Sequence, residues 1–111
     1  MKPLFIPLKT IYYEAFKDGI KTEELRRYGK RWNLETCIVG RKVALSKGYG
    51  KQDRMIGVIW RFKKQHGFLF GATDRASILG VYGTLDIDIA VISISGLTLW
   101  GGQYEPDIHS F

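Results

Sequence analysis

Four charged residues stand close together in the segment GIKTEELR, residues 19–26: Lys21, Glu23, Glu24 and Arg26. A lysine ammonium and an arginine guanidinium bind phosphate oxygens, while a carboxylate accepts hydrogen bonds or takes up a proton. Gathered in a sheltered cleft, such a set would bind or transform a polar ligand. Spread over a solvated surface, the same residues would form a ladder of ion pairs that contributes little energy. The residues alone leave both alternatives open.

Each charged residue has its own chemical role if the cleft exists. Lys21 would supply a hydrogen-bond donor and a point charge to a phosphate or a carbonyl oxygen. Arg26 would offer a planar fork to a phosphate or to the edge of a base. Glu24 would hold either cation in place, accept a hydrogen bond from a base amino group, or act as a base. Lys21 and Glu24 are therefore the candidate catalytic residues.

Aromatic and basic residues elsewhere could extend such a cleft over a nucleic acid. The glycine-rich loop SKGYGKQDR combines Lys51 and Arg54 with Tyr49, whose ring could stack on a base. The stretch RRYGKRW combines Tyr28 and Trp32 with four basic residues. Packing is the alternative role for these rings, in the core for Trp32 and within its loop for Tyr49. The complete set of candidate binding residues is Lys9, Lys21, Thr22, Glu24, Arg26, Tyr28, Trp32, Tyr49, Lys51 and Arg54.

The charge of the 111-residue chain is unevenly distributed. The formal net charge is +6, and residues 1–64 hold 16 lysines and arginines against 6 acidic residues. Residues 65–111 hold 1 basic residue against 5 acidic ones. A basic half on an otherwise acidic scaffold favours a polyanionic partner such as RNA or a nucleotide, and a basic protein without such a partner is the alternative.

Several classes of protein are unlikely from composition. Cys37 is the only cysteine, so no disulfide forms within the chain, and we expect it to pack as a small apolar residue. With His66 and His109 as the only histidines, neither a metal site nor a cofactor is expected. The N-terminus does not resemble a signal peptide, and no stretch approaches the ~20 apolar residues that span a bilayer. We therefore expect a cytoplasmic protein with no membrane partner.

Two short helices are predicted. The first runs from Thr10, which could cap its N-terminus, to Gly19, which could adopt the left-handed conformation that ends a helix. Its apolar face would consist of Ile11, Ala15 and Phe16, with Tyr12 beside them. The second helix would begin at Thr73 or Asp74, run to about Tyr82 and stop at Gly83.

The remaining pattern predicts about five strands. Residues 21–27 are ambiguous, and an extended conformation is favoured because no continuous apolar face would support a helix. Further strands are expected at 42–46, 54–63, 85–94 and 97–100. In 54–63 the side chains of Ile56, Val58, Trp60 and Phe62 should share one face, with Trp60 in the core.

The apolar alternation in 85–94 changes parity at Ile92, which indicates a bulge or a strand buried on both faces. Because the helices do not alternate with the strands, a parallel sheet is unlikely. We expect one mainly β, α+β domain over residues 1–111. It would be a small, strongly bent barrel of about five strands with two short helices, followed by a polar tail, 101–111.

Several segments of the sequence resemble those of a known protein family. The opening IPLKTIYYEAFKDGIKTEELR looks like the start of ASCH domains, which belong to the PUA-like superfamily. Their signature is a helix followed by G-x-K and then x-x-E-x-R or a close variant, and here it reads Gly19, Lys21, Glu24 and Arg26. VGRKVALSKGYG is similar to the family's second strand and glycine-rich loop, and ILGVYG with DIDIAVISI to its helix end and closing strand. The resemblance covers roughly residues 4–96.

The resemblance implies a PUA-like barrel with an RNA-binding cleft lined by the signature. Some members look like ribonucleases that act on single strands, and others are amidohydrolases that remove the acetyl group from acetylated cytidine. In that second branch a Lys, a Thr three residues later and a distant acid form the active site. Lys21 matches the Lys, Glu24 stands at the Thr position, and the sequence identifies no counterpart of the distant acid.

Three functions therefore remain as hypotheses. The leading one is an RNA- or nucleotide-binding domain with a basic cleft around Lys21, Glu24 and Arg26. The second is a metal-independent enzyme, either a ribonuclease or a hydrolase of a modified nucleoside. The third is a protein-binding adaptor of a bacterium or phage, in which Trp100, Tyr104 and Phe111 would contact a protein partner or a second copy of the chain.

Overall fold

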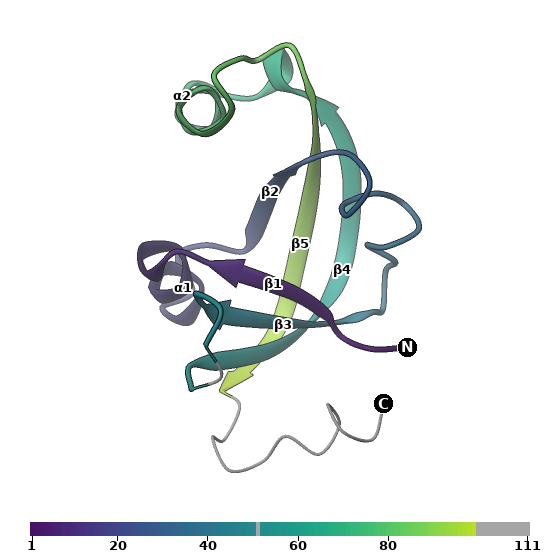
Figure 1. Cartoon of the computed structure of the whole chain (residues 1–111), viewed down its shortest axis with the longest axis vertical. Coiled ribbons are helices and arrows are strands. Elements are labelled where there is room, and N and C mark those ends of the chain that lie inside the picture. The colour runs from purple at the N-terminus through teal and green to yellow at the C-terminus, as the bar shows by residue number, and fades with distance from the viewer. Residues whose placement is uncertain (51, 100–111) are drawn as a thin grey trace.

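The computed structural model describes residues 1–50 and 52–99 (Figure 1). Lys51, the tail 101–111 and the apolar residues Trp100, Tyr104 and Phe111 lie outside these ranges. The elements, in chain order, are strand β1 (Leu4–Leu8), helix α1 (Thr10–Lys17), strand β2 (Glu23–Arg27), strand β3 (Lys42–Lys47), strand β4 (Arg54–His66), the 3₁₀ turn η1 (Gly67–Leu69), helix α2 (Ala72–Tyr82) and strand β5 (Asp88–Leu99).

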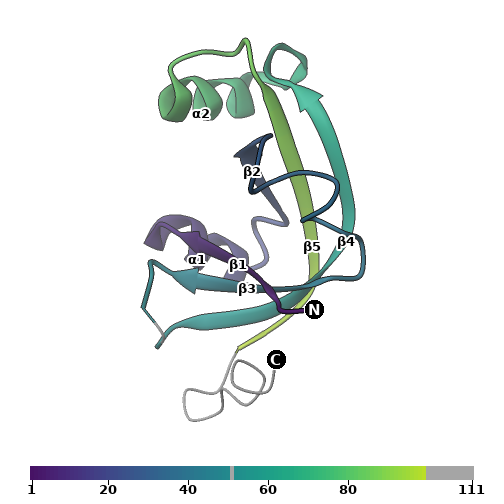
Figure 2. The same ribbon diagram turned by 45° about the vertical axis from the view of Figure 1, so that its right-hand side comes forward.

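The five strands form one mixed sheet in the order β1-β3-β4-β5-β2. Strand β1 runs parallel to β3, and the other neighbouring pairs are antiparallel. The long strands β4 and β5 curve together, so that the sheet curls into a half-barrel with β1 and β2 as its two free edges (Figure 2). The expected class is confirmed: the fold is α+β, mainly β, with a strongly bent sheet of five strands and two short helices.

Two strands differ from the sequence prediction. Strand β1 was not expected, because LFIPL is short and contains Pro7, which cannot donate a backbone hydrogen bond. It forms because an edge strand tolerates proline and because β3 supplies its partner from a distant part of the chain. In place of the two strands expected at 85–94 and 97–100, the described residues form a single strand, β5, over Asp88–Leu99.

Helix α1 lies against the sheet through a different face from the one expected. Tyr13 and Phe16 are buried, whereas Ile11 is exposed. The N-cap position is occupied by Lys9, so Thr10 is the first helical residue rather than the cap. The predicted end of the helix is confirmed, because Gly19 has φ +74° and turns the chain towards β2.

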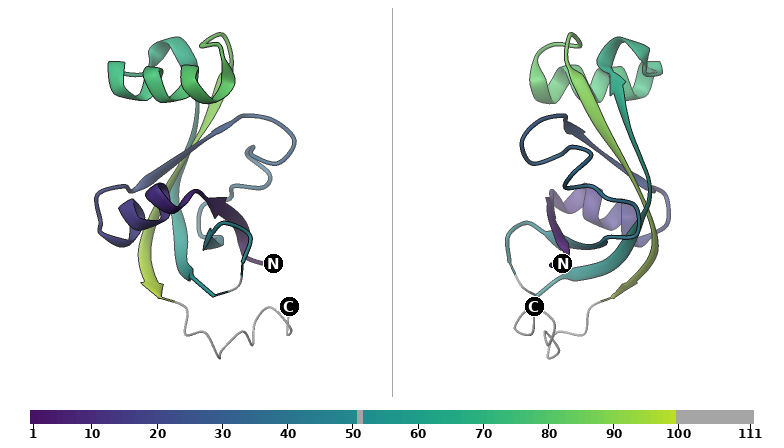
Figure 3. Two further views of the ribbon diagram at one scale, coloured as in Figure 1. Left: turned by 60° about the vertical axis from the view of Figure 1, so that its left-hand side comes forward. Right: turned by 90° about the vertical axis from the view of Figure 1, so that its right-hand side faces the viewer.

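Apolar side chains are buried on both faces of β5. Ala90, Ile92 and Ile94 belong to a core shared with α1, β1, β3 and β4. Ile89 and Val91 point the opposite way, into a smaller core beneath α2. Of the two explanations for the parity change, a strand buried on both faces is therefore the one observed, and α2 sits at the far end of the half-barrel from α1 (Figure 3).

The prediction that Trp60 lies in the core is wrong, since its side chain is 55% exposed. Met55 and Ile59 carry the core face of β4 instead. The register shifts between Ile59, which pairs with Ile94, and Arg61, which pairs with Ser93. This irregularity leaves Trp60 outside the regular pairing and lets Phe62 return to the core side, so simple alternation fails here.

Gly57 provides a test of the close packing between β4 and β5. A Cβ atom there would lie 2.8 Å from Leu97 Cδ2 and 3.0 Å from the Ser95 carbonyl oxygen. We expect Gly57→Ala to lower the free energy of unfolding by about 1–3 kcal/mol, measured by urea denaturation. In the control Gly80→Ala, within α2, the new methyl group meets no atom within 4 Å. That variant should gain about 0.5–1 kcal/mol, and equal stabilities of the two variants would contradict the packing described.

Cys37 should be inert in the folded protein. Its side chain is 2% exposed, and burial raises the pKa of the thiol, so the reactive thiolate is scarce near neutral pH. We expect a disulfide reagent such as DTNB to label Cys37 slowly in the native protein and rapidly in concentrated guanidinium chloride. Equal rates in the two conditions would show that this part of the core is open.

Candidate functional site

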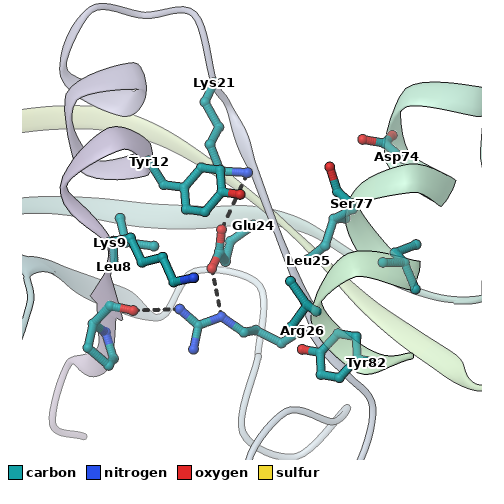
Figure 4. Close-up of a pocket in the computed structure, with 13 residues that line it drawn as sticks. Leu8, Lys9, Tyr12, Lys21, Glu24, Leu25, Arg26, Asp74, Ser77 and Tyr82 are labelled. Carbon is teal, nitrogen blue, oxygen red and sulfur yellow. Dashed lines mark hydrogen bonds and ion pairs between the residues drawn. The ribbon is translucent and has the colours of Figure 1, made fainter. Parts of the chain in front are cut away.

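A pocket of about 310 Å³ lies along β2, between the β1–α1 junction and α2 (Figure 4). It contains the signature residues predicted from the sequence together with a second wall from α2. Its lining consists of Pro7, Leu8, Lys9, Tyr12, Lys21, Glu24, Leu25, Arg26, Asp74, Ser77, Ile78, Val81 and Tyr82.

Lys21, Glu24 and Arg26 form a continuous chain of ion pairs on one wall of this pocket. Lys21 Nζ lies 3.4 Å from Glu24 Oε1, and Arg26 Nε donates to Glu24 Oε2 at 2.6 Å. Glu24 is 6% exposed, so its carboxylate is buried between the two cations. The set is therefore neither spread over bulk solvent nor a simple surface ladder.

The local structure explains why these three side chains meet. In β2 the side chains alternate between the two faces of the strand, so Glu24 and Arg26 share a face. Lys21 precedes the strand, and its backbone N–H donates to the Ala15 carbonyl at the end of α1. The turn at Gly19 thus brings the lysine back over the strand, where its ammonium lies 5.4 Å from the centre of the Tyr12 ring.

Arg26 also joins the two free edges of the sheet. Its Nη2 donates to the Pro7 carbonyl of β1 at 2.6 Å. Its guanidinium carbon lies 5.0 Å from the centre of the Trp32 ring, and Arg31 makes a second contact with that ring at the same distance. Trp32 is 8% exposed, so of its two possible roles the structure shows packing, in a position that fixes the plane of Arg26.

The other predicted binding residues divide between the pocket and the rest of the surface. Lys9 lines the pocket, and its ammonium points towards the guanidinium of Arg26 (Figure 4). Among the described residues Lys9 has no ion-pair partner. The structure does not bring Thr22, Tyr28, Tyr49 or Arg54 into the pocket.

Three of these residues have contacts of their own. The ring of Tyr28 lies against Phe62 and beneath the Lys64 ammonium. Tyr49 and Arg54 both lie close to the Phe5 ring, at the glycine-rich loop. The expected cluster around Tyr49 is therefore separate from the signature residues.

The wall contributed by α2 was missed by sequence reasoning. Asp74 and Ser77 face Lys21 and Tyr12 across the gap (Figure 4). A signal was present, because the five α2 residues that line the pocket follow the spacing i, i+3, i+4, i+7, i+8 of one helical face. Nothing in the spacing indicates that this face turns towards β2. The five residues are Asp74, Ser77, Ile78, Val81 and Tyr82.

The two walls differ in charge. Lys9, Lys21 and Arg26 outnumber the single carboxylate of Glu24 on the β1–β2 side, whereas Asp74 is the only charged residue on the α2 side of the lining. Between the walls lie apolar side chains and the rings of Tyr12 and Tyr82. Such a pocket suits a ligand with an anionic end, a flat apolar body and hydrogen-bond donors.

Among the described residues, no helix has both the length and the apolar character needed to cross a membrane.

Comparisons with known proteins identify the fold. No protein-family model matches the sequence, and no curated protein matches it. Among solved structures, the chain is similar to the crystal structure of a mutant of ZmASCH from Zymomonas mobilis, with a TM-score of 0.62 and 10% sequence identity. The match covers 86% of this chain and 70% of that one. The chain therefore has an ASCH-like fold.

Proposed function

We propose that this protein binds RNA or a nucleotide and holds one nucleotide unit in the pocket along β2. The supporting observation is the buried ion-pair chain of Lys21, Glu24 and Arg26 on a wall of a 310 Å³ pocket. Fixed cations beside a flat, mostly apolar space match the chemistry of a nucleotide, which combines a phosphate with an aromatic base.

Each part of the pocket corresponds to a part of this ligand. Lys9 and Lys21 would contact phosphate oxygens, and the guanidinium of Arg26 has donors beyond the two used by Glu24 and Pro7. Tyr12 offers a ring against which a base could stack. The pocket volume is at the small end of the usual range for ligand sites, which favours one nucleotide unit over a larger group.

The charge distribution favours a polyanion over a free nucleotide. The elements from β1 to β4 carry the basic half of the chain, while α2 and the start of β5 carry acidic residues. A strand of RNA leaving the pocket would therefore meet further cations on the β1–β4 side. A cytoplasmic location, where RNA is available, is part of this proposal.

Binding to single-stranded RNA should depend on Lys21 and on salt. We expect a fluorescent single-stranded RNA to bind in an anisotropy titration and to weaken steeply between about 50 and 200 mM salt. Lys21→Ala should raise Kd by roughly tenfold and reduce the salt slope by about 0.7. Lys17→Ala is the matched control, because it removes the same charge from an exposed residue at the C-terminal end of α1 that is not part of the pocket lining.

The control variant should stay within about twofold of the wild type, since an exposed charge that does not contact the ligand is largely screened by salt. If Lys17→Ala and Lys21→Ala weaken binding equally, the RNA contacts a diffuse basic surface and not the pocket. If no RNA binds even at low salt, the proposed function is incorrect.

A second candidate is hydrolysis of a modified nucleoside, and one observation favours it. Asp74, for which the sequence suggested no role, lines the same pocket as Lys21. The amidohydrolase branch of the family that the sequence resembles uses a lysine and a distant acid. In this chain Glu24 replaces the threonine of that set, and it is ion-paired with Lys21.

This candidate predicts that the protein converts N4-acetylcytidine and water into cytidine and acetate. The products would be separated by chromatography, and both Lys21→Ala and Asp74→Asn should abolish the conversion. Asp86→Asn is the control, because Asp86 is an exposed aspartate outside the pocket lining. Absence of product with the wild type, or equal product with Lys21→Ala, would leave binding as the only function of the pocket.

A further inference from the structure

Strand β2 presents a free backbone edge, because it pairs with β5 on one side only. The hydrogen bonds at the two ends of this pairing fix which residues face β5. Ile94 donates its backbone N–H to the Thr22 carbonyl, and Tyr28 donates its N–H to the Asp88 carbonyl. In an antiparallel ladder the bonded positions alternate, so Glu24 and Arg26 also bond to β5. The N–H and C=O groups of the residues between them point away from the sheet.

Only one of these outward-facing residues both lines the pocket and has a free backbone N–H. The N–H of Arg27 is already taken, because it donates to the Tyr82 hydroxyl at 3.0 Å. Glu23 is not part of the pocket lining, whereas Leu25 is. Within residues 1–50 and 52–99, neither the N–H nor the C=O of Leu25 has a hydrogen-bond partner. A residue of the pocket lining therefore has one backbone donor and one backbone acceptor without partners, side by side on the free edge of β2.

A single donor–acceptor pair limits what can bind there. Addition of an extended peptide to a sheet edge requires a run of alternating residues with free backbone groups. Here the Tyr82 hydroxyl already accepts from the N–H of Arg27, so the run of free backbone groups stops at that residue. The hydrogen bond from Arg26 to the Pro7 carbonyl spans the gap between β2 and β1. A flat group with one donor next to one acceptor fits this edge, and the Watson–Crick edge of a nucleobase has that arrangement.

We infer that the backbone of Leu25 reads the Watson–Crick edge of the base that occupies the pocket. This inference rests on the proposed function and names how the same site recognises its ligand. Leu25 N–H donates to a ring acceptor or carbonyl of the base, and Leu25 C=O accepts from the adjacent base N–H. The charged side chains Lys21 and Arg26 then remain for the phosphate.

The inference also predicts specificity. Each of the four RNA bases has a donor beside an acceptor on this edge, so the backbone of one residue accepts any of them. A methyl group on a ring donor nitrogen, N3 of uracil or N1 of guanine, removes the hydrogen bond and also places a carbon against the Leu25 carbonyl. The pocket should thus tolerate changes of base and reject bases that are methylated on their pairing edge.

Pentauridylate and the same strand methylated at N3 of every uracil form a matched pair of probes, because they carry identical phosphates. We expect pentauridylate to bind the wild-type protein at least about tenfold more tightly than the methylated strand, measured by fluorescence competition at low salt. Equal affinities would overturn the inference and leave the proposed function standing. If pentauridylate itself does not bind, the proposed function fails as well.

Two further measurements locate the contact at Leu25. Leu25→Pro removes the outward N–H without removing a bond to β5, which an edge strand tolerates. This variant keeps the Leu25 carbonyl, so it should still prefer pentauridylate over the methylated strand, but it should bind pentauridylate at least about tenfold more weakly than the wild type does. Leu25→Ala keeps the N–H and should keep the tenfold discrimination. If Leu25→Pro binds pentauridylate as tightly as Leu25→Ala does, the N–H of Leu25 does not contact the base and the inference is overturned.

Amide hydrogen exchange of the wild-type protein tests the same contact without any substitution, so it remains decisive if Leu25→Pro fails to fold. Exchange at Leu25 should slow at least about tenfold on addition of pentauridylate. Exchange at Arg27, whose N–H is bonded to Tyr82 in the free protein, should change much less. An unchanged rate at Leu25 in the bound protein would overturn the inference.

Discussion

The site depends on the hydrogen bonds that the guanidinium of Arg26 donates to Glu24 and to the Pro7 carbonyl. The half-barrel leaves β1 and β2 as free edges, and no backbone ladder joins them. Arg26 spans the opening by donating to Glu24 on its own strand and to the Pro7 carbonyl on β1, both at 2.6 Å. The Trp32 ring lies against the guanidinium and restricts its plane. One side chain thus sets the separation of the two edges and places unused donors beside the pocket. A lysine could not do this, because an ammonium lacks the planar fork that reaches two acceptors in fixed directions.

The burial of Glu24 depends on the same arginine, because Arg26 is one of its two ion-pair partners. A buried carboxylate is stable only when its charge is paired, and here Lys21 and Arg26 supply both partners. Removing one partner would leave an uncompensated charge, so the three side chains hold each other in place before any ligand arrives. Preorganised charges do not have to be reoriented on binding, which lowers the cost of association. The ion pair with Glu24 holds the Lys21 ammonium in place in the pocket lining, where it can contact an anion, and binding is therefore the leading proposal.

Short-range sequence patterns predicted more of this structure correctly than arguments about long-range packing did. The extended conformation of 21–27 and the turn at Gly19 could be derived, because strand alternation and left-handed glycine act within a few residues. Trp60 was misplaced because alternation does not reveal which face of a strand meets the core: Met55 and Ile59 are buried, and Trp60 lies on the opposite, exposed face of β4. Strand β1 was missed because its partner β3 lies about 35 residues away. The contact between Arg26 and Pro7 is likewise non-local, and the helical spacing in α2 defines a face without indicating that this face turns towards β2. The signature predicted the charged half of the pocket, and the half built by α2 required coordinates.

The signature lies on an edge strand, and this position adds free backbone groups that the residue pattern G-x-K-x-x-E-x-R does not by itself imply. In any strand, alternate residues would place the Glu24 and Arg26 side chains on one face, and both would pair through their backbones with one neighbour. In a central strand the intervening residue would pair with a second neighbour, and a ligand would meet side chains alone. On an edge strand the backbone of Leu25 is left open between the two charged side chains. A pocket along such an edge can therefore offer charge from the signature positions and directional, neutral hydrogen bonding from the position between them. That combination requires the sheet to remain open, and the bridge from Arg26 to β1 keeps it open at a fixed width.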